Sequence, residues 1–323
     1  MATRQPLDAT ACSLMVGLCA IWGLQQVALK ATASDIAPVL QIALRSGGAA
    51  LLVGLLMCWR GERLGLGDGH WRPGLLVGGL FALEFLLVGE GLRYTTASHM
   101  AIFLYTAPIF AALGLHWLMP SERLKPAQWL GISVAFGGIV VAFSGPSPAG
   151  HGGGSYVLLG DFLGVLGGVA WGATTVVVRC SRLASSPTTR TLQYQLLGAF
   201  VWLGLAALLT DQTSIHFTPL VVASLGFQVL VVSFASFLIW FTLLRRYPAS
   251  RLGVLSFMTP LFGIGFGVWL LHEPLESNFI FGALLVLAGI VMVSGYEWLR
   301  QRLKRNAQVA AAPASLPGSG PRA

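Results

Sequence analysis

Ten apolar stretches of about 20 residues follow one another along this chain, with short polar segments between them. A transmembrane helix needs about 20 apolar residues, whereas a strand of a membrane barrel shows about ten residues of alternating character. Charged residues make up 10% of the chain, against roughly 25% in soluble domains. We therefore predict an all-α polytopic membrane protein with ten transmembrane helices, at 13–30, 36–58, 73–92, 98–118, 126–144, 158–179, 191–210, 219–244, 251–271 and 277–297.

The basic residues indicate how the chain crosses the membrane. All but three of the 20 Lys and Arg residues fall in the terminal segments or in alternate connecting segments, the exceptions being Lys30, Arg45 and Arg93. Cytoplasmic segments of membrane proteins carry an excess of Lys and Arg, so we expect both termini to be cytoplasmic. The net charge of +8 does not indicate a nucleic-acid partner, because the basic residues do not gather in one patch.

The second half of the chain repeats the first. Trp22-Gly23 recurs as Trp171-Gly172, and Pro108 recurs as Pro260. Each repeat holds five predicted spans, and an odd number places the two halves in opposite orientations in the membrane. We expect an N-terminal cytoplasmic segment, a first five-helix repeat, an external linker, a second five-helix repeat and a disordered basic cytoplasmic tail, at 1–12, 13–144, 145–157, 158–297 and 298–323.

A proline lies near the centre of each of two corresponding stretches, 99–117 and 251–271. A proline inside a helix removes a backbone donor and kinks or breaks the helix. Within a bilayer such a break needs internal compensation, which a neighbouring helix or a water-filled cavity supplies. We predict that Pro108 and Pro260 act as two oppositely directed hinges at similar depth.

Polar and aromatic residues in the middle of the apolar stretches mark the candidate substrate site. Arg45 lies about nine residues from one end of its span and Glu84 about eleven from one end of the next, which gives both a similar depth at 1.5 Å per residue. We expect these two side chains to face one another or a shared cavity. The candidate substrate-binding residues are Trp22, Gln25, Arg45, Glu84, His99, Tyr105, Trp171, Thr174 and Gln195.

Each of these residues also has a structural interpretation. Gln25 can join helices by a hydrogen bond, and Arg45 with Glu84 can be a structural ion pair. His99 and Tyr105 can be packed residues that form a single hydrogen bond. Alternatively, Arg45 holds a carboxylate while Glu84 holds an amine or a proton, and the aromatic rings stack on an organic solute. The sequence leaves these interpretations open.

The chain resembles the drug/metabolite transporter superfamily over residues 13–297. The resemblance rests on the ten spans, the Trp-Gly pairs that precede Lys30 and Arg179, the arginine in the second span, and the prolines in spans four and nine. It is most similar to the EamA-type exporters, and within them to the YddG-like amino-acid exporters. The acidic residue usual after span four is present as Glu122 and recurs as Glu273.

This resemblance implies a transporter of the bacterial inner membrane. It implies export of amino acids, including aromatic ones, or of similar small metabolites from a central cavity lined by aromatic side chains. The inverted repeats with broken helices fit alternating access. Arg45 has no charged counterpart in the second half, so a symmetric charge mechanism is not expected.

Three other function classes compete with this hypothesis. An enzyme needs clustered carboxylates, a metal set or an activated nucleophile, and the 12 acids and six histidines are dispersed. A multidrug or other small-metabolite exporter of the same fold and a membrane channel are the alternatives kept open. We expect no cofactor, no metal and no nucleic acid, and as partners only a small-molecule substrate and the lipid bilayer, with the chain a monomer. Whether Glu84 carries a proton or neutralises Arg45 stays open.

Overall fold

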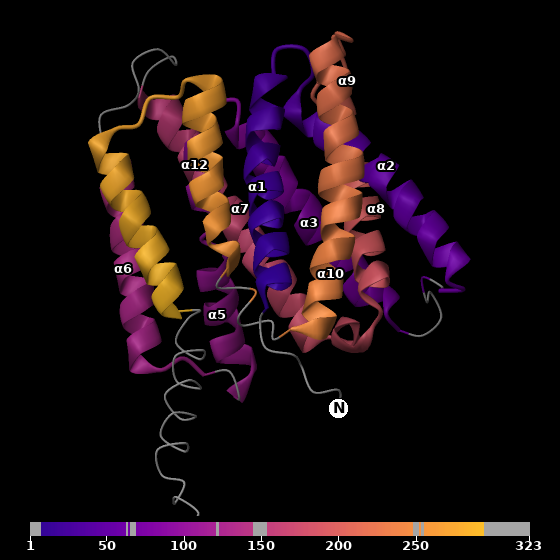
Figure 1. The fold of residues 1–323 in the computed structure, drawn as a ribbon, viewed down its shortest axis with the longest axis horizontal. Helices are drawn as coiled ribbons and strands as arrows, with labels where there is room; N and C mark the ends of the chain where they lie inside the picture. Colours follow the sequence, from indigo (N-terminus) through magenta and orange to yellow (C-terminus); the bar gives the residue numbers. More distant parts are fainter. Residues whose placement is uncertain are drawn as a thin grey trace, which may run out of the picture.

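The computed structural model describes residues 8–62, 64, 69–120, 123–144, 154–247, 252 and 255–293 (Figure 1). Its regular structure is helical, and the β-type pairing among these residues is one isolated bridge between Ile36 and Ile215. The predicted all-α class is thus confirmed for the described part of the chain. The N-terminal residues 1–7, most of the predicted linker (145–153), Glu122 and the predicted tail (298–323) lie outside the described residues.

Seven helical segments of the described chain are long and apolar enough to cross a membrane, and three shorter apolar helices accompany them. The first repeat supplies α1 (Ala9–Ala31), α2 (Pro38–Trp59), α3 (Trp71–Gly91), α4 (Ala97–Leu104), α5 (Ala107–Leu118) and α6 (Pro126–Phe143). The second supplies α7 (Gly154–Cys180), η2 (Arg182–Ser185), α8 (Thr188–Leu209), α9 (Pro219–Gly226), η3 (Phe227–Ser236), α10 (Phe237–Arg246), α12 (Met258–Leu271) and the helix Ser277–Val293.

The fourth apolar stretch is two helices rather than one. Helix α4 ends at Leu104 and α5 begins at Ala107, with Pro108 in its first turn. The hydroxyl of Thr106 donates to the carbonyl of Phe103 at 2.6 Å, which satisfies one of the backbone groups that the break frees. Proline is tolerated in a first helical turn because its missing N–H would have no partner there.

The corresponding stretch in the second half is interrupted in the same way. Phe257 lies in a turn, and α12 begins at Met258 with Pro260 as its third residue. Both prolines therefore lie in the first turn of a helix that follows a break. Arg251, where the predicted span begins, lies outside the described residues.

The eighth apolar stretch is continuous but changes its winding. Helix α9 passes into the π-helix η3, which returns to α-helix at Phe237. A π-helix is rare and marks functional positions more often than ordinary helix does. This wider segment carries Gln228 and Ser236, both of which are buried.

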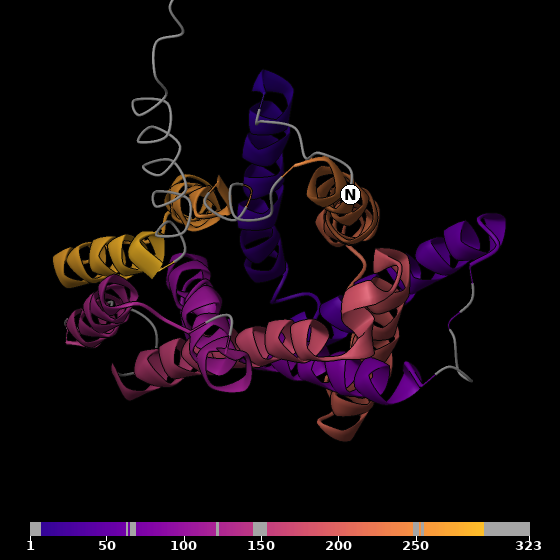
Figure 2. The ribbon, with the colours of Figure 1, turned by 90° about the horizontal axis from the view of Figure 1, so that it is seen from below.

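The helices pack into one bundle in which α1 lies between α12 and the α9–α10 segment (Figure 2). Helix α2 packs along α8, and α3 packs along both α7 and α8. The helix Ser277–Val293 lies beside α6 in both views. Many large apolar side chains stay exposed on the outer surfaces, as expected for a protein that faces lipid, among them Leu51, Trp59, Trp202 and Leu209.

Close contacts at glycine recur in the two halves. A Cβ atom on Gly23 would lie 2.8 Å from Phe262 Cβ, and one on Gly172 would lie 2.8 Å from Phe110 Cβ. The first contact joins α1 to α12, and the second joins α7 to α5, so equivalent helices meet at equivalent positions.

The α6 helix and the helix Ser277–Val293 show the same relation. A Cβ on Gly131 would lie 2.9 Å from the Gly289 carbonyl oxygen, and one on Gly138 would lie 2.7 Å from the Gly282 carbonyl oxygen. The residue number rises on one helix as it falls on the other, so these two helices run antiparallel. Small residues of this kind allow membrane helices to approach closely.

The bundle has two ends that are held differently. At the Asp8 end, the Tyr247 hydroxyl donates to the Asp8 carboxylate at 3.0 Å, and Asp8 caps α1 by accepting from the Ala11 N–H at 2.7 Å. The Ala11 N–H, followed by Tyr247, holds the pKa of Asp8 below its ordinary value. At the opposite end, the His99 end, the Lys30 ammonium donates to the carbonyls of Leu92 and Thr95.

Candidate functional site

The structure buries Arg45 and Glu84 without pairing them. Their exposed fractions are 3% and 4%. The Arg45 guanidinium lies over the ring of Phe85, 4.4 Å from its centroid, and Phe85 follows Glu84 on α3. No ion pair joins Arg45 to Glu84 within 4.0 Å, and both Arg45 Nε and Glu84 Oε2 lack a hydrogen-bond partner in the described part of the chain. A buried guanidinium and a buried carboxyl group therefore lie at the site with unused hydrogen-bonding capacity.

Arg45 is connected to the π-helix by a chain of polar side chains. Arg45 Nη1 donates to Gln228 Oε1 at 3.3 Å, and Gln228 donates to the Ser224 hydroxyl at 3.1 Å. The Gln41 amide also donates to Ser224, at 2.7 Å, and accepts from Thr32 at 3.0 Å. This ladder joins α2 to the π-helix and reaches the C-cap of α1, so it links one repeat to the other beside Arg45.

Tyr105 and Trp171 come together as an edge-to-face aromatic pair with ring centroids 5.1 Å apart. Tyr105 is the C-cap of α4 and thus lies at the break before Pro108. Trp171 on α7 packs against the apolar cluster that contains Phe85. The sequence-predicted residues Arg45, Tyr105 and Trp171 are therefore connected through Phe85 and its neighbours.

Trp22 belongs to a separate aromatic group that joins α1 to α10. Its indole Nε1 donates to the Ser236 hydroxyl at 2.9 Å, and its ring meets Trp240 edge-to-face with centroids 5.6 Å apart. Trp22 thus joins α1 to the C-terminal turn of the π-helix. Helix α1 and the π-helix, which the polar ladder beside Arg45 already links, are therefore connected a second time by Trp22.

The remaining predicted residues have less specific surroundings. Gln25 is buried on α1. The Thr174 hydroxyl donates to the carbonyl of Ala170 in its own helix at 3.0 Å, which is a common way for threonine to be satisfied in a membrane helix. Gln195 is half-buried on α8. The structure does not bring these three into contact with Arg45 or Glu84 through any hydrogen bond among the described residues.

His99 lies in another polar cluster, at the end of the bundle. Its Nδ1 is 2.9 Å from Asp161 Oδ2 and 3.0 Å from Oδ1, and its ring stacks on Phe279 with centroids 3.9 Å apart. Asp161 also accepts from the Thr95 hydroxyl. Nearby, Glu273 accepts from the backbone N–H groups of Ala97 and Ser98 and from the Ser98 hydroxyl, and so caps α4.

Several polar residues around these networks were not predicted as site residues, among them Asp161, Ser224, Gln228, Glu273 and Glu276. Asp161 and Gln228 each interrupt an apolar run, and that interruption was a visible signal, because polar groups inside a membrane span are costly without a role. Glu273 and Glu276 follow a span rather than interrupt one, so the same signal was absent.

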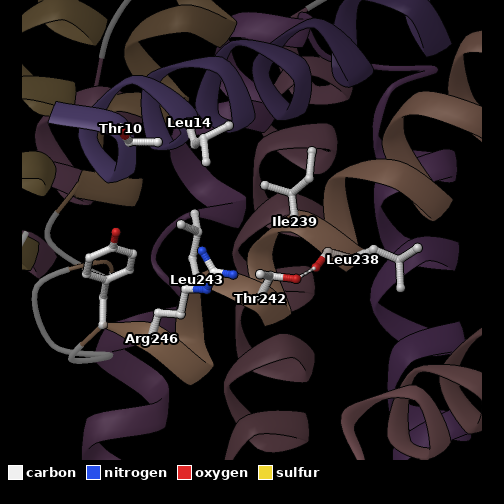
Figure 3. Close-up of a pocket in the computed structure, with 8 residues that line it drawn as sticks. Thr10, Leu14, Leu238, Ile239, Thr242, Leu243 and Arg246 are labelled. Atoms are coloured by element: carbon white, nitrogen blue, oxygen red, sulfur yellow. Dashed lines mark hydrogen bonds between the residues drawn. The ribbon is translucent and has the colours of Figure 1, made fainter. Parts of the chain in front are cut away.

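Two cavities lie away from the polar residues described above. A cavity of about 250 Å³ lies at the Asp8 end between α1 and α10, lined by residues that include Leu14, Ile239 and Arg246 (Figure 3). A second, of about 410 Å³, is lined by apolar residues of α2 and α8 with Thr213. Neither of these two cavities contains a sequence-predicted site residue.

Comparisons with known proteins agree with the arrangement of two similar halves. The EamA-like transporter family matches this chain twice, at residues 9–144 and 158–295. The uncharacterized transporter YoaV of Bacillus subtilis (strain 168) is 24% identical over 279 residues, which cover 86% of this chain and 94% of the relative. A probable amino-acid metabolite efflux pump of Escherichia coli (strain K12) is 25% identical over 294 residues, which cover 86% and 93%.

A solved structure, described only as the crystal structure of a protein, has a TM-score of 0.62 against this chain at 20% identity. The structural alignment covers 89% of this chain and 98% of the solved chain, so it supports the overall fold. The matched halves, the apolar helices and the shared fold have one common explanation. The chain is a multi-pass membrane protein that belongs to the EamA-like transporter family.

Proposed function

We propose that this transporter exports amino acids or similar small zwitterionic metabolites by alternating access. The observation that carries the proposal is a buried guanidinium and a buried carboxyl group that form no ion pair within 4.0 Å and that each keep an unpartnered atom among the described residues. Arg45 offers Nε and Glu84 offers Oε2 to a ligand, and neither atom has a partner among the described residues. A carboxylate suits a guanidinium and an ammonium suits a carboxylate, so one amino acid satisfies both groups.

The surroundings of these charges fit a small organic solute. Phe85 lies against Arg45, and Trp171 with Tyr105 adds aromatic surface from the same apolar cluster. Aromatic rings contribute both apolar contact and attraction for a cationic group. Two relatives, from Escherichia coli and Salmonella typhimurium, are named probable amino-acid metabolite efflux pumps, which supports the same substrate class here.

Ten spans in two inverted repeats remain the topology that we propose. It is supported by the antiparallel contact of α6 with Ser277–Val293 and by the matching contacts of α1 with α12 and of α7 with α5. In inverted-repeat transporters the ligand binds near the bilayer midplane, where the repeats meet and helices are broken. Arg45 belongs to one repeat and the π-helix to the other, and their hydrogen bond through Gln228 supports a ligand site at this contact.

The state of the two ends supports alternation. The His99 end is tied by Lys30, Glu273 and Asp161, each of which holds groups from another helix or loop. The Asp8 end has the 250 Å³ cavity between α1 and α10. We propose that the described conformation is closed toward the outside and that Pro108 and Pro260 are the hinges by which the other state forms. In this proposal the Asp8 end faces the cytoplasmic side of a bacterial inner membrane, the side on which we expect both termini.

Counterflow in proteoliposomes tests the proposed function. Vesicles loaded with unlabelled phenylalanine take up labelled phenylalanine transiently if the protein exchanges amino acids, and empty vesicles serve as the control. We expect exchange that other amino acids in the external medium inhibit. Absence of amino-acid exchange together with movement of larger cationic dyes would instead assign the chain to multidrug export.

A further inference from the structure

The His99 cluster, at the far end of the bundle from Asp8, is held by a carboxylate on each side of the imidazole ring. Asp161 on α7 contacts Nδ1 at 2.9 Å, and Glu276, just before the helix Ser277–Val293, lies 3.8 Å from Nε2. His99 itself is 3% exposed. Three segments from both repeats therefore meet at one buried imidazole.

The two ring nitrogens have different surroundings. Nδ1 is within hydrogen-bond distance of Asp161, which also accepts a hydrogen bond from the Thr95 hydroxyl. The stacked ring of Phe279 sets the plane of the imidazole. Nε2 has no hydrogen-bond partner in the described part of the chain, and neither has Glu276 Oε1. Because Nδ1 faces Asp161, Nε2 is the ring nitrogen that is left facing Glu276 with unused hydrogen-bonding capacity.

The charged groups around His99 leave the cluster short of positive charge. Asp161, Glu273 and Glu276 are three carboxyl groups, while of the described cations at this end the Lys30 ammonium binds the carbonyls of Leu92 and Thr95 and Arg93 pairs with Glu90. Asp161 and Glu273 accept hydrogen bonds from neighbouring groups, whereas Glu276 Oε1 has no hydrogen-bond partner among the described residues. Burial raises the pKa of the Glu276 carboxyl above its ordinary value, while His99 opposes that shift and Asp161 adds to it.

The three side chains differ in their exposure to solvent, so one of them is the most accessible to a proton from water. The Glu276 side chain is 19% exposed, whereas the side chains of His99 and Asp161 are 4% and 3% exposed. Water at this end of the bundle thus reaches Glu276 first, and a side-chain movement that shortens the 3.8 Å separation between Glu276 Oε2 and Nε2 to a hydrogen bond would let a proton pass. Nε2–H then forms, the Glu276 carboxylate is regenerated, and no other bond changes.

Helix α4 connects this cluster with the proposed substrate site. His99 is in its first turn, and Tyr105 at its C-cap packs against Trp171. A change in the charge around His99 acts on the eight-residue helix that carries Tyr105 at its other end. The cluster is therefore placed to sense protons at one end of α4 and to act on the aromatic pair at the other.

We propose that His99 and Glu276 form a proton-binding site through which proton entry drives substrate export. This inference rests on the proposed function and names the second transported species, the proton. A single proton held between Glu276 and Nε2 stabilises the closed His99 end, and its passage to the opposite side accompanies outward movement of the substrate.

The test compares two assays on the same proteoliposomes. Counterflow of phenylalanine needs no net proton movement, whereas efflux from loaded vesicles under an imposed outside-acid gradient reports coupling. The measured quantity is the ratio of efflux rates with and without the gradient. We expect a ratio of several-fold for the unchanged protein and a ratio near one for Glu276→Gln and His99→Gln. His216→Gln, an exposed histidine near the same end, is the matched control and keeps the several-fold ratio.

The possible failures are distinguishable. Counterflow by the unchanged protein without any response to the gradient overturns proton coupling but leaves the transporter assignment in place. Absence of counterflow overturns the proposed function itself. A several-fold ratio that persists in both variants shows that protons bind elsewhere. Glu276→Gln guards against misfolding of His99→Gln, because Glu276 is partly exposed and its Oε1 has no partner to lose.

A second measurement does not depend on vesicles. Detergent-purified protein in weakly buffered solution with a pH-sensitive dye should release protons when phenylalanine is added, if substrate and proton compete for opposite states. Release from the unchanged protein and from His216→Gln, but not from Glu276→Gln, is the expected result. Equal release from all three proteins contradicts the assignment to Glu276.

Discussion

Arg45 and Glu84 are both buried, yet no ion pair of 4.0 Å or less joins them, and the Arg45 guanidinium lies over the ring of Phe85 instead. Such an arrangement costs free energy, since an ionised group removed from water is stabilised only by good partners. A structural pair and a ligand site make different predictions for neutral variants, because a broken buried ion pair costs about 3–5 kcal/mol.

For Glu84→Gln we predict little loss of stability and a large loss of transport. No contact of 4.0 Å or less to Arg45 is removed, so the melting temperature in detergent should fall by no more than a few degrees. Loss of a charge-assisted contact to the substrate ammonium should raise KM at least tenfold, since such bonds contribute about 1.5–3 kcal/mol. Thermal unfolding and counterflow kinetics measure the two effects. A variant that unfolds while its residual KM stays unchanged would identify a structural pair.

Replacement of Trp171 by alanine tests the aromatic part of the site. The variant loses the edge-to-face contact with Tyr105, and such pairs are worth about 0.5–1.5 kcal/mol beyond their buried area. We expect a KM for phenylalanine raised by about threefold to tenfold, with the protein still monodisperse. Trp202→Ala on α8, where the ring is exposed, is the control. Kinetics equal to the unchanged protein would exclude Trp171 from the site.

Gly138→Ala should destabilise the contact between α6 and Ser277–Val293. Its Cβ would lie 2.7 Å from the carbonyl oxygen of Gly282 and from the backbone nitrogen of Val286, and backbone atoms cannot move aside cheaply. Overpacking of this kind costs about 1–3 kcal/mol. A Cβ on the adjacent Gly137 would meet nothing within 4 Å, so Gly137→Ala is the matched control. Equal melting temperatures for the two variants would contradict the antiparallel glycine contact.

Acidification should loosen the junction of α1 with the segment that follows α10. The Ala11 N–H and the Tyr247 hydroxyl hold the pKa of Asp8 below its ordinary value, so the folded state favours the ionised carboxyl. Its stabilising contribution is fully present above the ordinary pKa of about 4 and is lost as the pH falls through the lowered value. Between pH 7 and pH 3 the melting temperature should therefore fall less in Asp8→Asn than in the unchanged protein. Identical pH profiles would show that Asp8 carries no such contribution.

Much of the fold was predictable from the sequence, because lipid imposes a simple rule on length and polarity. Apolar runs of about 20 residues correspond to α1, α2, α3 and α8, and Pro108 marked the place where α4 gives way to α5. The π-helix was not predictable in this way. Gln228 and Ser236 of the π-helix contact Arg45 on α2 and Trp22 on α1, and these contacts between helices exist only in the assembled bundle.

The sequence identified polar and aromatic residues of the candidate site, but it did not predict which of them contact one another. Depth along the helices placed Arg45 and Glu84 in one layer, yet it did not reveal that Gln228 would hold Arg45. His99 and Tyr105 were both predicted to bind the substrate, whereas the structure joins His99 to Asp161 on α7 and Tyr105 to Trp171. Rotation around a helix axis separates residues that are close in sequence, and only packing fixes that rotation.

Competition by paired analogues of phenylalanine in the counterflow assay tests the central claim most directly. Phenylalaninamide lacks the carboxylate and 3-phenylpropionate lacks the ammonium, while both keep the ring. If Arg45 and Glu84 hold the two charges, phenylalanine inhibits counterflow at least tenfold more strongly than either analogue. In Glu84→Gln the advantage of phenylalanine over 3-phenylpropionate falls to about threefold or less, because the ammonium has lost its partner. Equal inhibition by all three compounds in the unchanged protein would contradict recognition of a zwitterion at Arg45 and Glu84.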